Sequence, residues 1–504
     1  MIVCVEAHAH DRAPRQDGIV IALGALAARL AIVAWAHARF PAVEDGYFYD
    51  TLARRLASGQ GYTWLWPDGV VTYAAHYPVG YPAALAGAYA LVGASPLVAM
   101  LLNATLGSLA AFAVHRLLAA ATTRPRAAMG AVAFALHPAL LGYTPAIMTE
   151  AVTAYLLAIA AGLAAHARDA SGARRAWRWR VATGIALGAA TLVRPQTLLL
   201  APLVGYFAAG TGVRRRIASC VAVTALAVAC CLPWTLRNCT KMDRCALVSV
   251  NAGWNLLIGA RTPTGGWAPV EPPPTECREV WSEAEKDLCF ERAARAEIAH
   301  APLAWLARAP AKLAATFDYF GAAPWYLHAS NPTAFDARAK TTLGIVETAL
   351  SRALLLVALV ASARLVGPRQ KLRYVLAGAG ALASVSVHAW IGYVLLAGVL
   401  AALGRRRLED GPLVFPMTAL VIVATALTHA VFFGAGRYGL VVVPFVTALA
   451  FVGRAVRTER ATPIVPLASE SRKSSTSSGS SSRASAARSS PSDVRDARRA
   501  SALY

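Results

Sequence analysis

Long apolar runs alternate with short polar segments along most of the chain. An α-helix needs about 20 apolar residues to cross a hydrocarbon core of roughly 30 Å. The runs predict spans at residues 19–40, 96–120, 126–143, 146–167, 180–194, 196–210, 217–236, 342–366, 373–388, 389–404, 412–434 and 437–456. Residues 80–93 are also apolar, but the run is short and interrupted by Gly and Pro, which favours a re-entrant or juxtamembrane helix. The predicted fold is all-α, a polytopic transmembrane bundle of about twelve helices.

Two long segments outside the spans interrupt this pattern, residues 41–78 and residues 238–340, the second between the seventh and eighth predicted spans. The second contains a Pro/Gly-rich stretch at 262–274 and then an amphipathic helical stretch at 282–317. We therefore expect a membrane domain over residues 1–460. The Ser-, Ala- and Arg-rich residues 461–504 cannot build a core and predict a disordered cytoplasmic tail that can touch anionic lipid.

Basic residues mark one side of this predicted bundle. Cytoplasmic loops of membrane proteins carry an excess of Lys and Arg. Here the clusters that fall on one side are Arg124/Arg126, Arg174/Arg175/Arg178/Arg180, Arg214–Arg216, Arg364/Arg369/Lys371/Arg373, Arg405–Arg407 and Arg454/Arg457/Arg460. This side is expected to be the cytoplasm, with both termini on it and both long segments outside.

The composition agrees with a membrane protein and changes how the charge is interpreted. Hydrophobic residues make up 57% of the 504 and charged residues 15%, too apolar a balance for a soluble chain of this length. The formal charge of +22 would suit a nucleic-acid binder. Because the basic residues sit in short loops between apolar runs, no nucleic-acid partner is expected.

The start of the chain allows two interpretations. Arg12 and Arg15 precede the first apolar run, and Ala36-His37-Ala38 is similar to a signal-peptide cleavage site. The run is nevertheless long enough to span a membrane, and Arg29 interrupts it. A retained first helix is the favoured interpretation.

The cysteines differ by compartment. Four of them, Cys239, Cys245, Cys277 and Cys289, fall in the second outer segment, where an oxidising compartment permits disulfides. Four cysteines allow three pairings. The short-range set, Cys239 with Cys245 and Cys277 with Cys289, is preferred. No Cys/His spacing predicts a structural zinc site, and a divalent metal at the carboxylates is left open.

Ionisable side chains gather at the predicted outer ends of the spans. They are Glu44, Asp45, Glu150, Arg194, Arg237, Arg437 and the neighbouring Tyr438. A carboxylate can act as general base for an acceptor hydroxyl, and Arg can bind the phosphate of a leaving group. The set therefore favours transfer of a group from a phosphorylated donor. Alternatively, each charge caps a helix or extends to the membrane interface. His76 can contact a phosphate or sugar, or simply be an exposed loop residue.

Seven fragments follow one another in the order found in a known superfamily. They are Glu44-Asp45-Gly-Tyr-Phe-Tyr49 with Leu56-Ala-Ser-Gly-Gln-Gly-Tyr62, His76-Tyr-Pro-Val-Gly-Tyr-Pro82 leading to Leu91-Val-Gly93, Thr149-Glu150, Leu192-Val-Arg-Pro195, Pro233-Trp-Thr-Leu-Arg-Asn238, Asn251-Ala-Gly-Trp-Asn-Leu-Leu-Ile-Gly259 and Arg437-Tyr438. With this order the chain resembles the GT-C polytopic glycosyltransferases. The resemblance is to the bacterial members related to protein O-mannosyltransferases and the lipid A aminoarabinose transferase, glycosyltransferase family 39-like.

The resemblance implies roles for these residues. Asp45 matches the first-loop aspartate and would be the catalytic base or acceptor-orienting group, with Glu44 as its neighbour. Arg237 and Arg437 would bind the donor phosphate, and Glu150 and Arg194 would shape the outer rim of the cavity.

Two positions depart from the family pattern. Gly46 replaces the acidic or small residue that some relatives carry after the aspartate. His76 stands where close relatives of the aminoarabinose enzyme carry a lysine, which leaves the head group of the donor open.

The resemblance also implies substrates and a location. It implies a polyprenyl-phosphate-linked sugar as donor, used on the outer face of the bacterial plasma (inner) membrane. The acceptor is a protein, a glycan or a lipid, and an acceptor hydroxyl would attack the anomeric carbon.

Two other functions compete: a transporter or lipid-linked sugar flippase without transferase activity, and a scaffold whose outer loop binds partners. A scaffold predicts that Asp45, Arg237 and Arg437 lie in separate surroundings.

Overall fold

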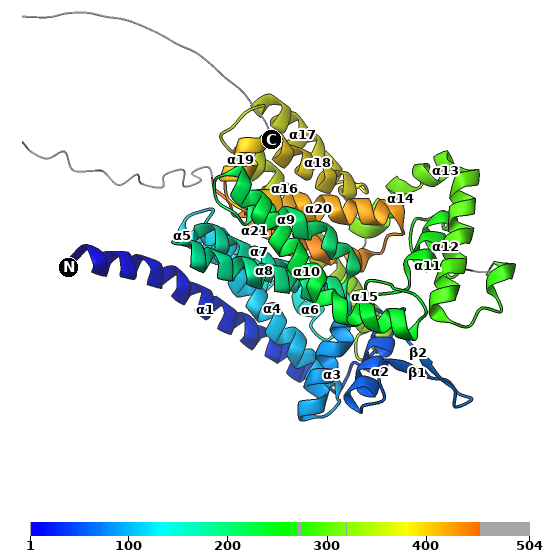
Figure 1. Ribbon diagram of the computed structural model, residues 1–504. Coiled ribbons are helices and arrows are strands. Elements are labelled where there is room, and N and C mark those ends of the chain that lie inside the picture. The colour runs from blue at the N-terminus through cyan, green and yellow to red at the C-terminus, as the bar shows by residue number, and fades with distance from the viewer. Residues whose placement is uncertain (1, 271–273, 319, 454–504) are drawn as a thin grey trace, which may run out of the picture. The chain divides into compact units, whose positions relative to one another are not determined.

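Helices dominate the computed structural model, which describes residues 2–270, 274–318 and 320–453 (Figure 1). The prediction of an all-α protein is confirmed. Within the described residues, the named strands form one short antiparallel hairpin in the first outer segment, where Thr63 pairs with Tyr73. The predicted tail at residues 461–504 lies outside the described residues.

The elements up to the second outer segment follow in this order. They are α1 (Ile2–Ala36), α2 (Asp45–Ala57), β1 (Thr63–Leu65), β2 (Val71–Tyr73), α3 (Gly80–Val92), α4 (Pro96–Ala119), α5 (Arg124–Ala135), α6 (Pro138–Gly142), α7 (Thr149–Asp169), α8 (Ala173–Val193), η1 (Pro195–Leu200), α9 (Ala201–Phe207) and α10 (Val213–Lys241).

The remaining elements begin with the second outer segment. They are α11 (Ala252–Arg261), η2 (Thr275–Cys277), α12 (Glu283–His300), α13 (Pro302–Ala307), α14 (Ala309–Phe317), α15 (Ala322–Ser330), α16 (Ala337–Ala363), α17 (Gln370–Ser384), α18 (Ala389–Ala401), α19 (Arg405–Asp410), α20 (Val414–Val431), η3 (Gly436–Val442) and α21 (Val443–Ala450). The amphipathic stretch predicted at 282–317 is thus three helices, with Pro302 and Pro310 in the first turns of α13 and α14.

Six described helices are long and apolar enough to cross a membrane, so the chain is a multi-pass membrane protein. They are Arg15–Ala36 of α1, α4, α7, α10, α16 and α20. Shorter apolar helices cover Gly80–Val92, Ala389–Ala401 and Gly436–Ala450. The number of twelve spans remains a prediction, because several of the apolar runs form shorter or interrupted helices.

Prolines explain the interruption of two of these apolar runs. The run at 126–143 is divided into α5 and α6 at Pro138, and the run at 196–210 begins as a 3-10 helix at Pro195. Proline has no backbone N–H and its ring crowds the preceding turn, so it favours a helix start and disfavours a helix interior. The helix α10 nevertheless continues through Pro233. His137 Nδ1 accepts a hydrogen bond from Ala139 N at 3.3 Å and caps α6.

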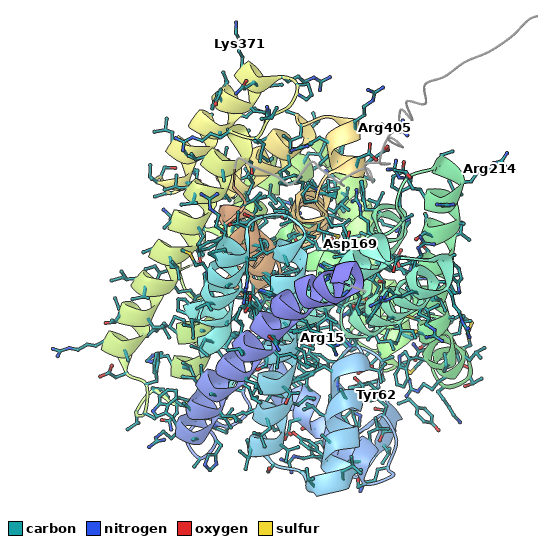
Figure 2. The ribbon with its side chains drawn as sticks, turned by 90° about the vertical axis from the view of Figure 1, so that its left-hand side faces the viewer. Arg15, Tyr62, Asp169, Arg214, Lys371 and Arg405 are labelled. Carbon is teal, nitrogen blue, oxygen red and sulfur yellow. A yellow bond between two sulfur atoms is a disulfide. The ribbon has the colours of Figure 1, made fainter. Side chains whose placement is uncertain are left out.

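Residues of three predicted cytoplasmic basic clusters lie at one end of the described structure, and the first outer segment lies at the other. Figure 2 shows Lys371, Arg405 and Arg214 toward one end and Tyr62, in the first outer segment, toward the other. This separation agrees with the sidedness predicted from loop charge.

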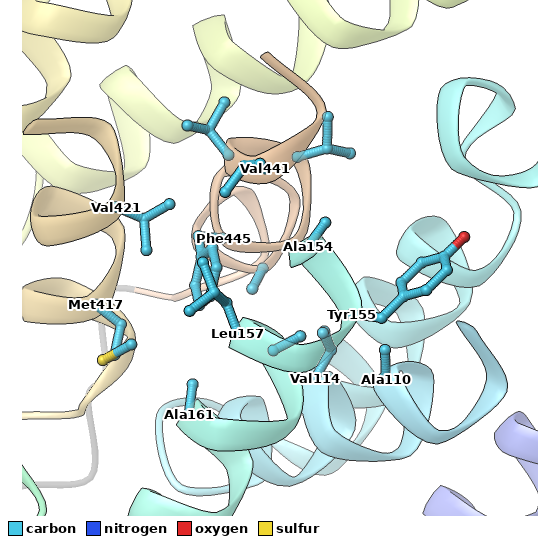
Figure 3. Packing of buried hydrophobic residues seen from close by; sticks show 14 of the residues in the cluster. Ala110, Val114, Ala154, Tyr155, Leu157, Ala161, Met417, Val421, Val441 and Phe445 are labelled. Atoms are coloured by element: carbon cyan, nitrogen blue, oxygen red, sulfur yellow. The ribbon is translucent and has the colours of Figure 1, made fainter. Parts of the chain in front are cut away.

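Ala154, Leu157 and Ala161 of helix α7 lie in the main hydrophobic core (Figure 3). The first turn of α7 carries Glu150. Helix α7 packs against α4, α8 and η3 largely through alanines and Gly162. A Cβ on Gly162 would lie 2.9 Å from the Cβ of Ala113, so the backbones of α4 and α7 approach closely. Small residues permit such contacts between helices in lipid, and they set the position of the first turn of α7.

The packing of α3 against α8 provides a test of this architecture. A Cβ on Gly80 would lie 2.5 Å from the carbonyl carbon of Leu192, whereas a Cβ on Gly87, in the same helix, would meet nothing within 4 Å. We expect Gly80→Ala to destabilise the protein by about 1–3 kcal/mol because the helix must shift. Gly87→Ala should leave it unchanged or slightly more stable. Thermal unfolding in detergent compares the two, and equal melting temperatures would contradict the observed packing.

Candidate active site

An ion pair joins the first outer segment to the segment before α21. Arg437 Nη2 donates to Asp45 Oδ2 at 2.6 Å, across 392 positions of sequence. The side chain of Asp45 is 30% exposed and that of Arg437 is 19% exposed. The pair is therefore screened on most sides yet open to a ligand.

Glu150 forms the buried base of this site. Its side chain is 1% exposed, and Oε1 lies 3.1 Å from Nε of Arg437 and also pairs with Arg194. Tyr143 donates to the other oxygen at 3.4 Å, and Arg194 Nε donates to Thr149 Oγ1 at 3.1 Å. Two carboxylates and two guanidiniums thus form one chain, in the order Asp45, Arg437, Glu150, Arg194. Glu150 holds both arginines, and the more exposed Asp45 is the carboxylate that a substrate can reach.

Local backbone geometry places Asp45 at this position. Glu44 has a φ of 55°, and Asp45 then begins α2. Such a φ in a non-glycine residue costs of order 1–3 kcal/mol and is found where the surrounding structure demands it. Gly46 follows, where a Cβ would lie 2.8 Å from the carbonyl oxygen of Ile147. The departure at Gly46 therefore has a steric reason, because only glycine lets α2 approach the segment before α7 this closely. Glu44 itself is exposed, and no described residue forms an ion pair with it.

Tyr438 and Arg194 line a cavity beside the charged chain. The guanidinium of Arg194 lies 4.6 Å from the centre of the Tyr438 ring, and the His429 ring stacks on the Tyr438 ring with the two centres 4.4 Å apart. The walls of this cavity come from α7, η1, α20 and η3. Besides Arg194 and His429, the walls carry apolar side chains such as Leu157, Val421 and Ala424 and hydroxyl or amide side chains such as Thr153 and Thr425.

Tyr77 belongs to the site although it was not predicted as a site residue. Its hydroxyl donates to Asp45 Oδ1 at 3.3 Å, and its ring stacks on Phe48 at 5.2 Å. Burial, and then the neighbouring Asp45 carboxylate, raise the pKa of Tyr77 well above its ordinary value. The hydroxyl therefore stays protonated and available as a donor. The His76-Tyr-Pro fragment contained it, but nothing in the sequence singled it out from the other loop tyrosines.

The structure places His76 and Arg237 outside the charged chain. Arg237 donates to the carbonyls of Ala74 at 2.8 Å and Tyr62 at 2.9 Å and lies over the Trp234 ring. These contacts fasten the first outer segment to the end of α10. The ring of His76 packs against Tyr77 and Trp254. Of the predicted set, Asp45, Glu150, Arg194, Arg437 and Tyr438 come together.

Glu283 joins the two outer segments, and no sequence signal pointed to it. It accepts hydrogen bonds from Trp64 Nε1 at 2.6 Å, Ala75 N at 2.6 Å and His76 N at 2.8 Å. Charged acceptors make stronger hydrogen bonds than neutral ones. Because Tyr77 follows these residues directly, Glu283 also fixes the segment that delivers Tyr77 to Asp45.

The outer cysteines form two disulfides in this structure, Cys239 with Cys245 and Cys277 with Cys289. The first closes the end of α10, and the second joins η2 to α12.

Among the described residues, no three His, Cys, Asp or Glu side chains gather in a way that could hold a metal ion. The residues of the charged chain do not fit a dedicated metal site, and no chemical step is assigned to one.

A family model matches a part of the chain that contains Tyr77, Glu150 and Arg194 but not Asp45 or Arg437. Residues 68–236 match the model described as dolichyl-phosphate-mannose-protein mannosyltransferase. The match confirms the resemblance to GT-C membrane glycosyltransferases that the ordered motifs predicted. No curated protein matches the chain.

Solved structures from two organisms are similar to the chain at a low level. The oligosaccharyltransferase AglB of Archaeoglobus fulgidus, solved with an inhibitory peptide and a dolichol-phosphate, is 16% identical with a TM-score of 0.42. The match covers 86% of this chain and 50% of AglB, so the chain spans about half the length of that protein. ArnT of Cupriavidus metallidurans bound to undecaprenyl phosphate is 15% identical with a TM-score of 0.35, covering 86% of this chain and 76% of ArnT.

The link made by Glu283 can be tested without an activity assay. Glu283→Ala leaves the Trp64, Ala75 and His76 donors without their acceptor, at a cost of about 1–3 kcal/mol. We expect a lower melting temperature and faster proteolysis within residues 62–77. Glu285→Ala, an exposed residue on the same helix, is the matched control. If both variants behaved like the wild type, the two outer segments would not depend on Glu283.

Proposed function

We propose that this chain is a GT-C glycosyltransferase that moves a sugar from a polyprenyl-phosphate-linked donor to an acceptor hydroxyl on the outer face of the membrane. The observation that carries the proposal is the charged chain Asp45, Arg437, Glu150, Arg194, which brings together residues from four distant segments. A scaffold predicts separate surroundings for Asp45, Arg237 and Arg437. The ion pair between Asp45 and Arg437 supports transfer over a scaffold, whereas Arg237 lies apart from it. The proposed setting is the bacterial inner membrane, with both termini in the cytoplasm.

In the proposed reaction, Asp45 acts as the general base. The acceptor oxygen attacks the anomeric carbon, its proton passes to Asp45, and the bond between the anomeric carbon and the phosphate oxygen breaks. Asp45 suits this role because its side chain is 30% exposed, whereas Glu150 is 1% exposed. The hydrogen bond from Tyr77 orients Asp45 Oδ1.

The arginines stabilise the departing lipid phosphate in this proposal. The two carboxylates and two guanidiniums of the charged chain are balanced before reaction. When Asp45 takes the proton it loses its charge, so Arg437 loses an anionic partner as the phosphate gains negative charge. Transfer of Arg437 from carboxylate to phosphate keeps the local charge balanced. Glu150, which stays ion-paired, keeps both arginines in place.

The cavity beside Arg194 offers a place for the lipid of the donor. A phosphate near Arg194 and Arg437 would leave the proximal isoprenoid units facing walls such as Leu157, Val421 and Val441. Leu and Val side chains beside a guanidinium match the chemistry of a prenyl phosphate.

Replacing the proposed base tests the reaction directly. We expect Asp45→Asn to lower transfer by about 10²–10⁴-fold, because an amide cannot take the acceptor proton. The measurement is sugar transfer by purified protein in lipid, supplied with a panel of polyprenyl-phosphate sugars and acceptors. The control is Asp68→Asn in the same outer segment, where Asp68 caps the hairpin turn by accepting from Val70 N at 3.0 Å. Full activity of a folded Asp45→Asn protein would contradict the role of Asp45.

Narrowing the cavity tests the position of the donor lipid. Ala424 lines the cavity and Ala426, two residues along α20, does not. We expect Ala424→Phe to raise the donor KM by about tenfold, a loss of roughly 1.4 kcal/mol in binding, with kcat little changed. Ala426→Phe should leave KM at the wild-type value. An equal KM for the two variants would place the donor lipid elsewhere.

A further inference from the structure

Residues 432–436 connect α20 to η3 and decide where Arg437 points. This connection lies against the second outer segment with very little space. A Cβ on Gly259 would lie 2.0 Å from the carbonyl oxygen of Phe432, and a Cβ on Gly434 would lie 2.0 Å from the carbonyl oxygen of Lys312. Gly434 N also donates to Gly265 O at 2.8 Å. The connection is therefore held by backbone contacts with α11, with Gly265 shortly after α11, and with α14.

Lys312 extends this contact with its side chain. It is 0% exposed, and Nζ donates to the carbonyl oxygens of Ala430 at 3.2 Å and Val431 at 3.1 Å. Nζ also lies 5.1 Å from the centre of the Trp305 ring. Within the described part of the chain, no carboxylate forms an ion pair with Lys312. Its buried ammonium group is compensated by the end of α20 and by an aromatic face.

These contacts have a physical reason at the end of a helix. The last carbonyls of a helix have no partner within it, and they carry partial negative charge. The carbonyl oxygen of Thr428 accepts a hydrogen bond from Phe432 N at 3.0 Å. The carbonyl oxygens of Ala430 and Val431, in the last turn of the helix, accept hydrogen bonds from Lys312. The ammonium group therefore fixes the direction in which the chain leaves α20. Arg437 follows Val431 by six positions and must reach both Asp45 and Glu150.

We infer that Lys312 is a positioning residue for Arg437: by binding the last carbonyls of α20 it sets the path of residues 432–436 and so the place of the guanidinium at the site. This inference rests on the proposed function for its activity readout. Lys312 does not touch Asp45, Glu150 or the proposed donor cavity. Its effect on transfer passes through Arg437.

A double-mutant cycle tests this route. Lys312→Met keeps the apolar stem and removes the ammonium group, and Arg437→Lys keeps the charge but loses the forked geometry. We expect Lys312→Met to lower kcat/KM by about a hundredfold, the effect of misplacing a catalytic group by roughly 1 Å. In the Arg437→Lys background the same substitution should cost much less, because residues that act through one another are not additive. Lys286→Met, on α12 with its ammonium group over the Trp281 ring, is the matched control.

A second measurement does not depend on activity. Hydrogen exchange of the amides of residues 432–438 should become faster in Lys312→Met and stay unchanged in Lys286→Met. If Lys312→Met does not fold, Lys312→Gln, which keeps a neutral donor, takes its place in both experiments. Lys312→Arg should recover part of the activity because it keeps the cation.

The outcomes separate the two proposals. A wild-type protein without transfer to any acceptor would overturn the proposed function, while unchanged exchange at 432–438 would overturn the inference about Lys312. An active wild type with equal losses from Lys312→Met in both backgrounds would show that Lys312 acts on stability and not through Arg437, which would also overturn the inference.

Discussion

The ion pair between Asp45 and Arg437 is the interaction on which the rest of the site depends. It joins residues 392 positions apart, and it requires the first outer segment and the start of η3 to meet at the first turn of α7. A partly buried pair is costly to break, because removing one partner leaves the other charge desolvated, at about 3–5 kcal/mol for a buried pair. Glu150 shares Arg437 with Asp45, so the site behaves as one electrostatic unit.

The membrane helices and the outer segments contribute differently to this unit. Helices α4, α7 and α8 pack through small residues, and this close packing sets the positions of Glu150 and Arg194. The outer segments place the partners that lie at the surface. Glu283 holds the first segment near Tyr77, and Lys312 holds the end of α20 before Arg437. Both act on backbone groups, which explains how side chains distant from the chemistry can control its geometry.

The different exposures of the two carboxylates suggest why the site carries both. A buried carboxylate that is permanently paired can orient arginines, but it cannot receive a substrate. A partly exposed one can do so, provided that its neighbours keep it in place. Asp45 and Glu150 divide these tasks, with Arg437 between them. The neutral balance of the four charges also allows one arginine to move from carboxylate to phosphate without leaving a buried charge alone.

The sequence by itself determined the helical class, the membrane location, the sidedness expected from loop charge and the candidates Asp45, Glu150, Arg194 and Arg437. Apolar runs, basic loops and ordered motifs are local signals, and local signals survive in a linear chain. Only the tertiary structure decided that Arg237 fastens a loop while Arg437 meets Asp45, that Glu150 is buried, and that Glu283 and Lys312 bind backbone groups of distant segments. Those outcomes depend on which helix ends and backbone carbonyls meet across long stretches of chain, and a local sequence pattern does not show which of them meet.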